Sequence, residues 1–304
     1  MRALTFWLRP AFALRVVGRF QRLVGFDRSM ALASSGFSAV VPLLIVSGVV
    51  LARLGSKDTA HRIIDRYHLT GGGAEAVRYV FSPSGDVSAG VGVFGLLFLA
   101  VSLLSFSRAV QRLFEQVWEL PPLSVRNTLN GLRWIAGLLG YLTVTAWFTA
   151  VLGQGRPPLG GAVAQAPLTA LFLVWSGRVL SARRVGLREL LPFGLVAAVV
   201  EAAYSVGATV YLPRLFNSSA AQYGAMGAVF ALVSALFGVM FVLVGSAAVG
   251  REVRDELDRL ARGERPADDE VRREWDQVIA QARLKWQSAR EQLAAHHRPR
   301  RPRR

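Results

Sequence analysis

The chain has 304 residues, 52% of them hydrophobic, and its 36 Lys and Arg against 20 Asp and Glu give a formal net charge of +16. This composition is too apolar for a soluble domain, whose surface must be largely polar. The absence of cysteine excludes disulfides, thiolate metal sites and cysteine nucleophiles.

The N-terminal segment 1–28 combines apolar side chains with arginines at helical spacing. Arg15, Arg19 and Arg22 follow an i, i+4, i+7 pattern, with Leu14 directly before them and Val17 between the first two. This pattern predicts an amphipathic helix that lies at a membrane interface. The arginines also interrupt every candidate signal-peptide core, which argues against a cleaved leader.

Six hydrophobic runs follow this arm. Crossing about 30 Å of hydrocarbon takes about 20 helical residues. The runs lie near 29–53, 88–107, 131–152, 165–181, 187–212 and 223–250. The sequence therefore predicts an all-α polytopic membrane bundle of about six transmembrane helices. Between the first two runs, a Gly-rich breaker at 70–73 predicts a small helical hairpin outside the membrane.

Positive charge alternates between the segments that connect the runs. The N-terminal arm, the segments after the second and fourth runs and the tail are rich in arginine, whereas the third and fifth loops carry only Arg156 and Arg214. Basic residues in the first loop are balanced by acids. Because positive charge flanking the spans stays inside, we expect both termini in the cytoplasm.

The tail 251–304 is soluble in character. One charged helix continues the last run, and a second begins near Asp268 after a Gly-Glu-Arg-Pro break. The second helix has an apolar stripe suited to packing on protein or on a membrane surface, made of Val271, Trp275, Val278, Ala282, Ala289 and Leu293. Its basic end is suited to anionic lipid, the partner that we expect.

Several short motifs stand in a fixed order against these runs. They are 31–34 (ALAS) with 41–44 (VPLL), 106–112 (FSRAVQR) running to Trp118, 183–185 (RRV) with 191–194 (LPFG), and 223–228 (YGAMGA). Together they resemble the YihY/virulence factor BrkB family of bacterial inner-membrane proteins, once called ribonuclease BN.

The resemblance implies a multi-pass bacterial inner-membrane protein. Some members of that family look like candidates for export of lipid or lipopolysaccharide, and we expect the ribonuclease label to be a misassignment. The chain departs from the family pattern at Glu115, where members usually have Asn, and at 245–247 (GSA), where members usually have Gly-Ala-Glu.

Glu201 lies well inside the fifth run, where an ionisable side chain costs at least a few kcal/mol unless it faces protein or water. One interpretation is a proton or cation relay, or a polar contact to a lipid headgroup, in a cavity between helices. The other is a protonated structural carboxyl bonded to a neighbouring helix.

Arg108 and Arg112 lie near the end of the second run that we expect to face the cytoplasm. They either extend toward water or hold lipid phosphate. Pro42 removes a backbone hydrogen bond in mid-span and should kink the first helix, with Ser38 or Ser35 able to bond the freed carbonyl. Gly224 and Gly227 allow close helix approach, and plain packing is the favoured explanation.

The sequence holds no HExxH, GxSxG or P-loop motif, so we expect no catalytic, cofactor or metal residues. Our first hypothesis is a bundle that transports or exports a lipid or another amphipathic anionic molecule. The alternative is a membrane scaffold that recruits partners through its tail, and a membrane-associated ribonuclease ranks last. We expect no specific nucleic-acid partner, and small-residue faces permit a homo-oligomer.

Overall fold

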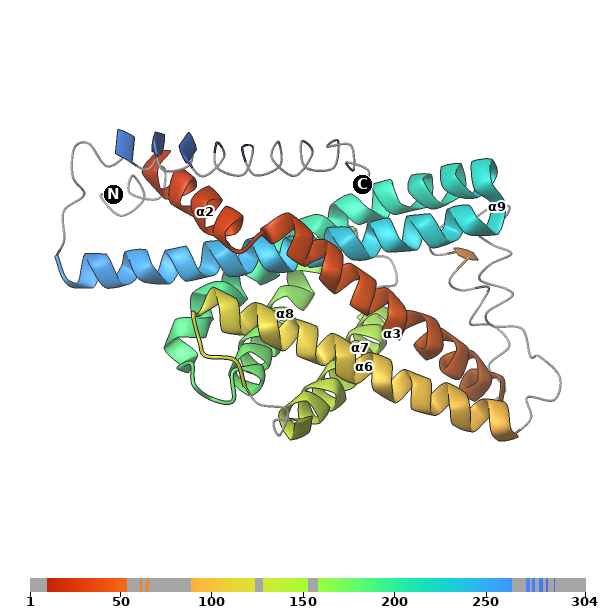
Figure 1. The fold of residues 1–304 in the computed structure, drawn as a ribbon. Helices are drawn as coiled ribbons and strands as arrows, with labels where there is room; N and C mark the ends of the chain where they lie inside the picture. The colour runs from red at the N-terminus through yellow and green to blue at the C-terminus, as the bar shows by residue number, and fades with distance from the viewer. Residues whose placement is uncertain are drawn as a thin grey trace, which may run out of the picture. The chain divides into compact units, whose positions relative to one another are not determined.

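The computed structural model describes residues 10–53, 61, 64–65, 89–123, 128–152 and 158–263 and, in the tail, 272–273, 275–276, 279–280, 283 and 287. All regular structure in these residues is helical, which confirms the predicted all-α class (Figure 1). The helices are α2 (Pro10–Arg22), α3 (Gly25–Arg53), α6 (Ala89–Val117), α7 (Thr128–Leu152), α8 (Pro158–Leu180) and α9 (Leu187–Ala261).

Two predicted elements lie mostly outside the described residues: the hairpin of the first loop and the second helix of the tail. The chain divides into two compact units. One is Leu23–Arg254, and the other combines Met1–Arg22 with Asp255–Arg304. The N-terminal arm and the tail, which are far apart in the sequence, therefore belong to one unit.

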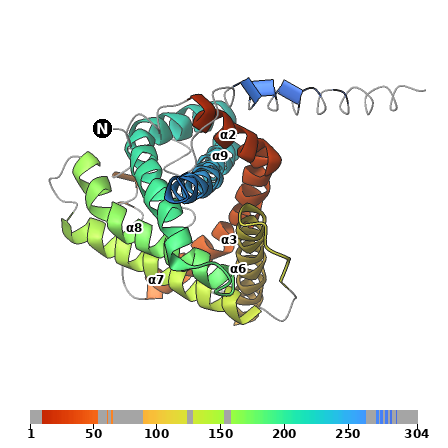
Figure 2. The same ribbon diagram turned by 90° about the vertical axis from the view of Figure 1, so that its left-hand side faces the viewer.

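In the unit Leu23–Arg254, α3 packs along α6, α6 along α7 and α7 along α8. Figures 1 and 2 both show α6 beside α3 and α7 beside α8. Gly137 makes one of these contacts close, because a Cβ atom placed there would lie 2.1 Å from the Trp175 ring of α8. Trp134 is buried in the packing, whereas Trp147 is exposed.

Helix α9 is a hairpin of two long arms rather than one rod. At Gly224 the backbone has φ 58° and ψ −137°, a conformation that side-chain-bearing L residues rarely adopt. Just beyond the turn, a Cβ at Gly227 would lie 1.9 Å from the carbonyl oxygen of Ser219. The Tyr204 hydroxyl of the first arm donates to the Ala235 carbonyl of the second (3.2 Å), which holds the arms together.

This hairpin differs from the predicted loop at 213–222, because the first arm stays helical through Pro213 to Gly224. A proline removes one backbone bond and does not by itself end a membrane helix. Other helices are also longer than the predicted runs: α6 continues to Val117, and α8 begins at Pro158.

Four segments of the described residues are long and apolar enough to cross a membrane: Phe94–Val117, Gly160–Leu180, Leu187–Gly224 and Val229–Ala261. Helices α3 and α7, with 29 and 25 residues, cover the predicted first and third spans. The helical membrane bundle is thus confirmed as a class, and the count of six crossings stays a prediction.

Pro42 is buried within α3, which continues as a helix on both sides of it. The hydroxyl of Ser38 donates to the carbonyl of Ser34 (3.1 Å). Pro42 lacks the N–H that would bond to the Ser38 carbonyl, so that carbonyl is the one left free. The Ser38 hydroxyl bonds instead to the Ser34 carbonyl, one turn before the one that we expected it to satisfy.

Candidate functional site

Arg108 and Arg112 both lie exposed on α6, one helical turn apart and therefore on one face. Neither forms a hydrogen bond or an ion pair with the residues that the structure describes. Other arginines of this part of the chain are engaged: Arg133 donates to the Asn130 side chain (3.3 Å), and Arg184 donates to the Pro121 carbonyl just beyond α6 (2.6 Å). Both guanidinium groups of this face of α6 are therefore exposed at the surface of the described part of the chain.

Glu201 lies on the inward face of the first arm of α9. It continues, at helical spacing, a stripe that begins with the fully buried Leu190 and Phe193 and passes through Ala197. The carboxyl is half-buried, and within the described part of the chain no hydrogen bond or ion pair joins it. Its position therefore matches a carboxyl that faces protein rather than lipid.

Two hydroxyl groups from neighbouring helices lie in the surroundings of Glu201. Glu201 lies near enough to the Tyr141 hydroxyl of α7 for an electrostatic interaction, and that hydroxyl shares a hydrogen bond of 2.8 Å with Thr169 of α8. The Tyr141 ring stacks on Phe172 with centroids 4.3 Å apart, which fixes the direction of the hydroxyl. Three helices thus bring polar oxygen atoms into this part of the bundle.

The structure places Glu201 and the two arginines at different depths. A Cβ at Gly131 of α7 would lie 2.9 Å from the Ser107 hydroxyl, beside Arg108. Tyr141 lies ten residues further along α7, about 15 Å at the helical rise per residue. A single headgroup therefore does not contact Glu201 and the two arginines at once. The carboxyl and the arginine pair are two separate candidate sites.

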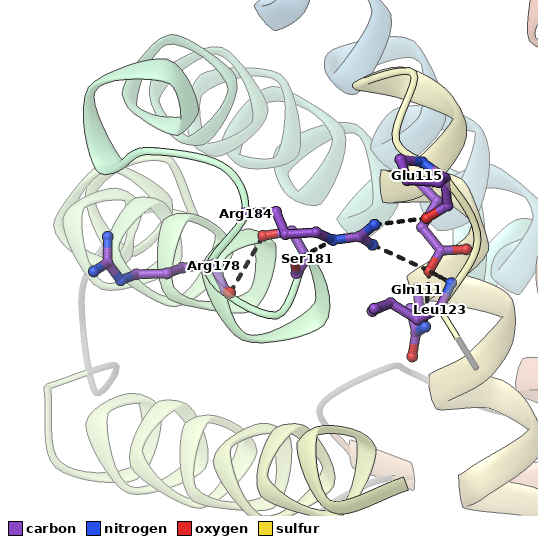
Figure 3. Close-up of polar contacts among 7 residues, drawn as sticks. Gln111, Glu115, Leu123, Arg178, Ser181 and Arg184 are labelled. Carbon is purple, nitrogen blue, oxygen red and sulfur yellow. Dashed lines mark hydrogen bonds and ion pairs between the residues drawn. The ribbon is translucent and has the colours of Figure 1, made fainter. Parts of the chain in front are cut away.

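Sequence reasoning missed a buried polar cluster at the end of α6 (Figure 3). Glu115 is only 5% exposed. Its Oε1 atom accepts from Gln111 Nε2 (2.9 Å) and from the Leu123 backbone N–H (2.9 Å), and Arg184 Nη2 lies 3.5 Å away. We call Glu115 and Arg184, with these bonds, the end clasp.

Arg184 reaches across from the connection between α8 and α9. Its Nη1 donates to the Pro121 carbonyl (2.6 Å) and its Nε to the Ser181 carbonyl (3.0 Å), so one guanidinium joins two connecting loops. The end clasp therefore fixes both loops to the end of α6. The one sequence signal for the end clasp was the acid at position 115, where family members usually have Asn. Its partner Arg184 belongs to an Arg-Arg motif that comes close to Glu115 only in the folded chain.

Several residues with unusual backbone torsion angles lie in the same two loops. Glu119, Ala182 and Arg183 have φ of 52°, 52° and 62°, in the left-handed region that non-glycine residues seldom occupy. Below them, Phe114, Trp118 and Phe193 form a ring cluster with centroids 5.3 to 5.7 Å apart. Aromatic packing and the end clasp together hold these turns in place.

In the unit made of the N-terminal arm and the tail, two arginines of α2 form ion pairs with acidic residues at the end of α9. Arg15, buried within the protein, pairs with Glu256 (2.6 Å), and Arg19 pairs with Asp255. Val17 and Ala13 lie exposed on the opposite side of α2. The helix is amphipathic as predicted, with its central arginines bonded to the end of α9, and its place at a membrane interface stays a prediction.

The described residues hold no group of three acids or histidines able to bind a metal ion. The tail stripe is represented there by Trp275, which is 53% exposed. On the helices long enough to cross a membrane, large apolar side chains such as Phe94, Leu171 and Val199 are exposed. Lipid is the solvent that suits such a surface.

These long apolar helices define an integral α-helical membrane protein. Within that class, the chain belongs to the Virulence factor BrkB family, whose sequence profile matches residues 16–270. This confirms the resemblance noted from the short motifs. No curated protein and no solved structure matches the chain.

Proposed function

We propose that this protein transports an amphipathic anionic molecule, a lipid or a lipid-like compound, across or out of the bacterial inner membrane. In this proposal Arg108 and Arg112 attract the anionic group at the end of α6. Glu201 acts deeper in the bundle, as a polar contact or as a carrier of a proton or cation. Both termini lie in the cytoplasm.

The observation that supports this proposal most is the position of Glu201. A charge inside a membrane segment costs at least a few kcal/mol, so a carboxyl that only packs should have a bonded partner. Glu201 instead lies on the inward stripe beside the Tyr141–Thr169 hydrogen bond, without a bond of its own to the described residues. Such an arrangement suits a group that exchanges contacts.

The test is the movement of a fluorescent phosphatidylglycerol between leaflets of vesicles that contain the purified protein. Glu201→Gln keeps the size of the side chain and removes its charge. We expect transfer to slow about tenfold or more, since a hydrogen bond to a charged group contributes about 1.5–3 kcal/mol. Glu189→Gln is the matched control, because Glu189 lies in the first turn of the same helix.

Transfer at the wild-type rate in Glu201→Gln would contradict the transport proposal. The scaffold hypothesis then gains weight, and it makes a different prediction. A chain that lacks 251–304 should keep lipid transfer if the bundle is a transporter, whereas a scaffold should lose the partners that it recruits. Unchanged transfer together with a lower melting temperature in Glu201→Gln would identify the carboxyl as structural.

A further inference from the structure

We infer that one outward face of α6 is a binding site for an anionic phospholipid, with the phosphate on Arg108 and Arg112 and an acyl chain along the apolar side chains next to them. This inference deepens the proposed function by naming the ligand class and its docking face. It rests on that function only for the choice of an anionic lipid, and it does not involve Glu201.

The first step is the alignment of the residues. At 100° per residue, Arg108, Arg112, Val101, Leu97 and Phe94 fall within a sector of about 60° of the helix surface. The three apolar members are 58%, 61% and 75% exposed, and both arginines are exposed as well. The α6 stripe, as we name these five residues, is therefore a continuous open strip.

The second step is the match in length. Val101 lies about 10 Å and Phe94 about 21 Å from Arg108 along the helix axis. One leaflet contributes about half of the roughly 30 Å of hydrocarbon. An acyl chain whose headgroup lies at Arg108 therefore runs along Val101 and Leu97 toward the middle of the bilayer. The α6 stripe thus has a charged end for a headgroup and an apolar length for an acyl chain, the two parts of a phospholipid.

The third step is the chemistry of the charged end. Guanidinium groups bind phosphate oxygens in a bidentate manner, and two of them one turn apart can hold one phosphate from two sides. A single arginine extending toward water needs no such pair and no apolar strip below it. The fact that neither Arg108 nor Arg112 bonds to the described residues leaves both groups in place for an anion.

The experiment titrates the detergent-purified full chain with dioleoyl phosphatidylglycerol or dioleoyl phosphatidylcholine and counts bound lipid by native mass spectrometry. These lipids have the same chains and differ in headgroup charge. We expect wild-type protein to bind phosphatidylglycerol about tenfold or more tightly, and Arg108→Gln/Arg112→Gln to lose that preference, since charged hydrogen bonds of this kind determine it.

Two controls isolate the α6 stripe. Arg183→Gln/Arg188→Gln removes the same amount of charge from two exposed positions, one in the connection between α8 and α9 and one in the first turn of α9, and it should keep the preference. Arg108→Lys/Arg112→Lys keeps the charge without bidentate geometry, and it should lie between wild type and the Gln variant. If the Gln variant fails to fold, the Lys variant alone decides: a preference equal to that of wild type overturns the bidentate site.

A soluble anion is the other possible source of a phosphate group. Inorganic phosphate at millimolar concentration should leave the bound phosphatidylglycerol in place, because it lacks the chain that lies on Val101 and Leu97. Displacement by phosphate, or an unchanged preference in Arg108→Gln/Arg112→Gln, overturns the inference. Lost transfer in Glu201→Gln with intact lipid preference would separate the two proposals, since the α6 site then stands on its own.

Discussion

Glu115 carries a charge that is almost fully removed from solvent, and three donors around it satisfy one carboxylate oxygen. Burying a charged pair does not by itself add stability, because desolvation offsets the attraction. Removing one partner is costly, since the other charge is left unpaired. The end clasp therefore determines where the two loops lie more than it adds to the overall stability.

This asymmetry can be measured with a double-mutant cycle on the end clasp. We expect Arg184→Ala to destabilise the protein by about 2–4 kcal/mol, because Glu115 keeps its charge but loses its counter-ion. Glu115→Gln should cost less, since the amide keeps an acceptor for the N–H of Leu123. Thermal unfolding in detergent gives the values.

The coupling energy in that cycle should reach about 0.5–3 kcal/mol, the range for residues in direct contact. Arg183→Ala provides the comparison, because Arg183 is the exposed neighbour of Arg184. Strict additivity of Glu115→Gln and Arg184→Ala would show that the ion pair contributes nothing beyond its separate hydrogen bonds.

At the scale of helices, hydrophobic runs predicted α6, α7 and α8 because the need for about 20 apolar residues per crossing leaves a strong pattern. The turn of α9 could not be located in the same way. The polar residues around Asn217 resemble a loop, yet the backbone bonds there are met within the helix until Gly224. The first arm of α9 ends where the backbone of a single residue, Gly224, changes conformation, and such a change is hard to recognise from the amino-acid composition of the segment.

The site shows the same division. Glu201 could be selected as a candidate from the sequence because a lone acid in an apolar run is rare, and the arginines of α6 because they end such a run. The end clasp could not, since Glu115 and Arg184 are 69 residues apart and meet only through the packing of α6 against α8. The two hydroxyls near Glu201 depend likewise on how α7 and α8 face each other.

Gly224→Ala tests the hairpin of α9. A Cβ at this position meets no atom within 4 Å, so the effect comes from the backbone alone. We expect a loss of about 1–3 kcal/mol, since the conformation is one that L residues rarely adopt. Thermal unfolding measures it.

Gly207→Ala is the matched control for the hairpin. Gly207 lies inside the first arm of α9 with open space around it. Alanine is a better helix former than glycine by about 1 kcal/mol, so this variant should be unchanged or more stable. Equal effects of the two substitutions would mean that the turn does not depend on the backbone of Gly224.

For the whole molecule, the proposed orientation leads to a labelling experiment that the sequence makes simple, because the chain has no cysteine. Gln287→Cys places a thiol in the tail, and Ser218→Cys places one near the turn of α9; both positions are exposed. In intact spheroplasts a membrane-impermeant maleimide should label the Ser218→Cys variant and not the Gln287→Cys variant, and it should label both after lysis. The reverse pattern would contradict cytoplasmic termini.

The ion pair between Arg15 and Glu256 also restricts the path of the chain between them. Side chains whose charged atoms are 2.6 Å apart lie on one side of the hydrocarbon layer. We therefore expect the chain that leaves α2 to return to the side from which it started and to cross the bilayer an even number of times. A topology with five crossings would contradict this expectation, and so would any insertion or deletion that adds or removes a single span while the pair stays intact.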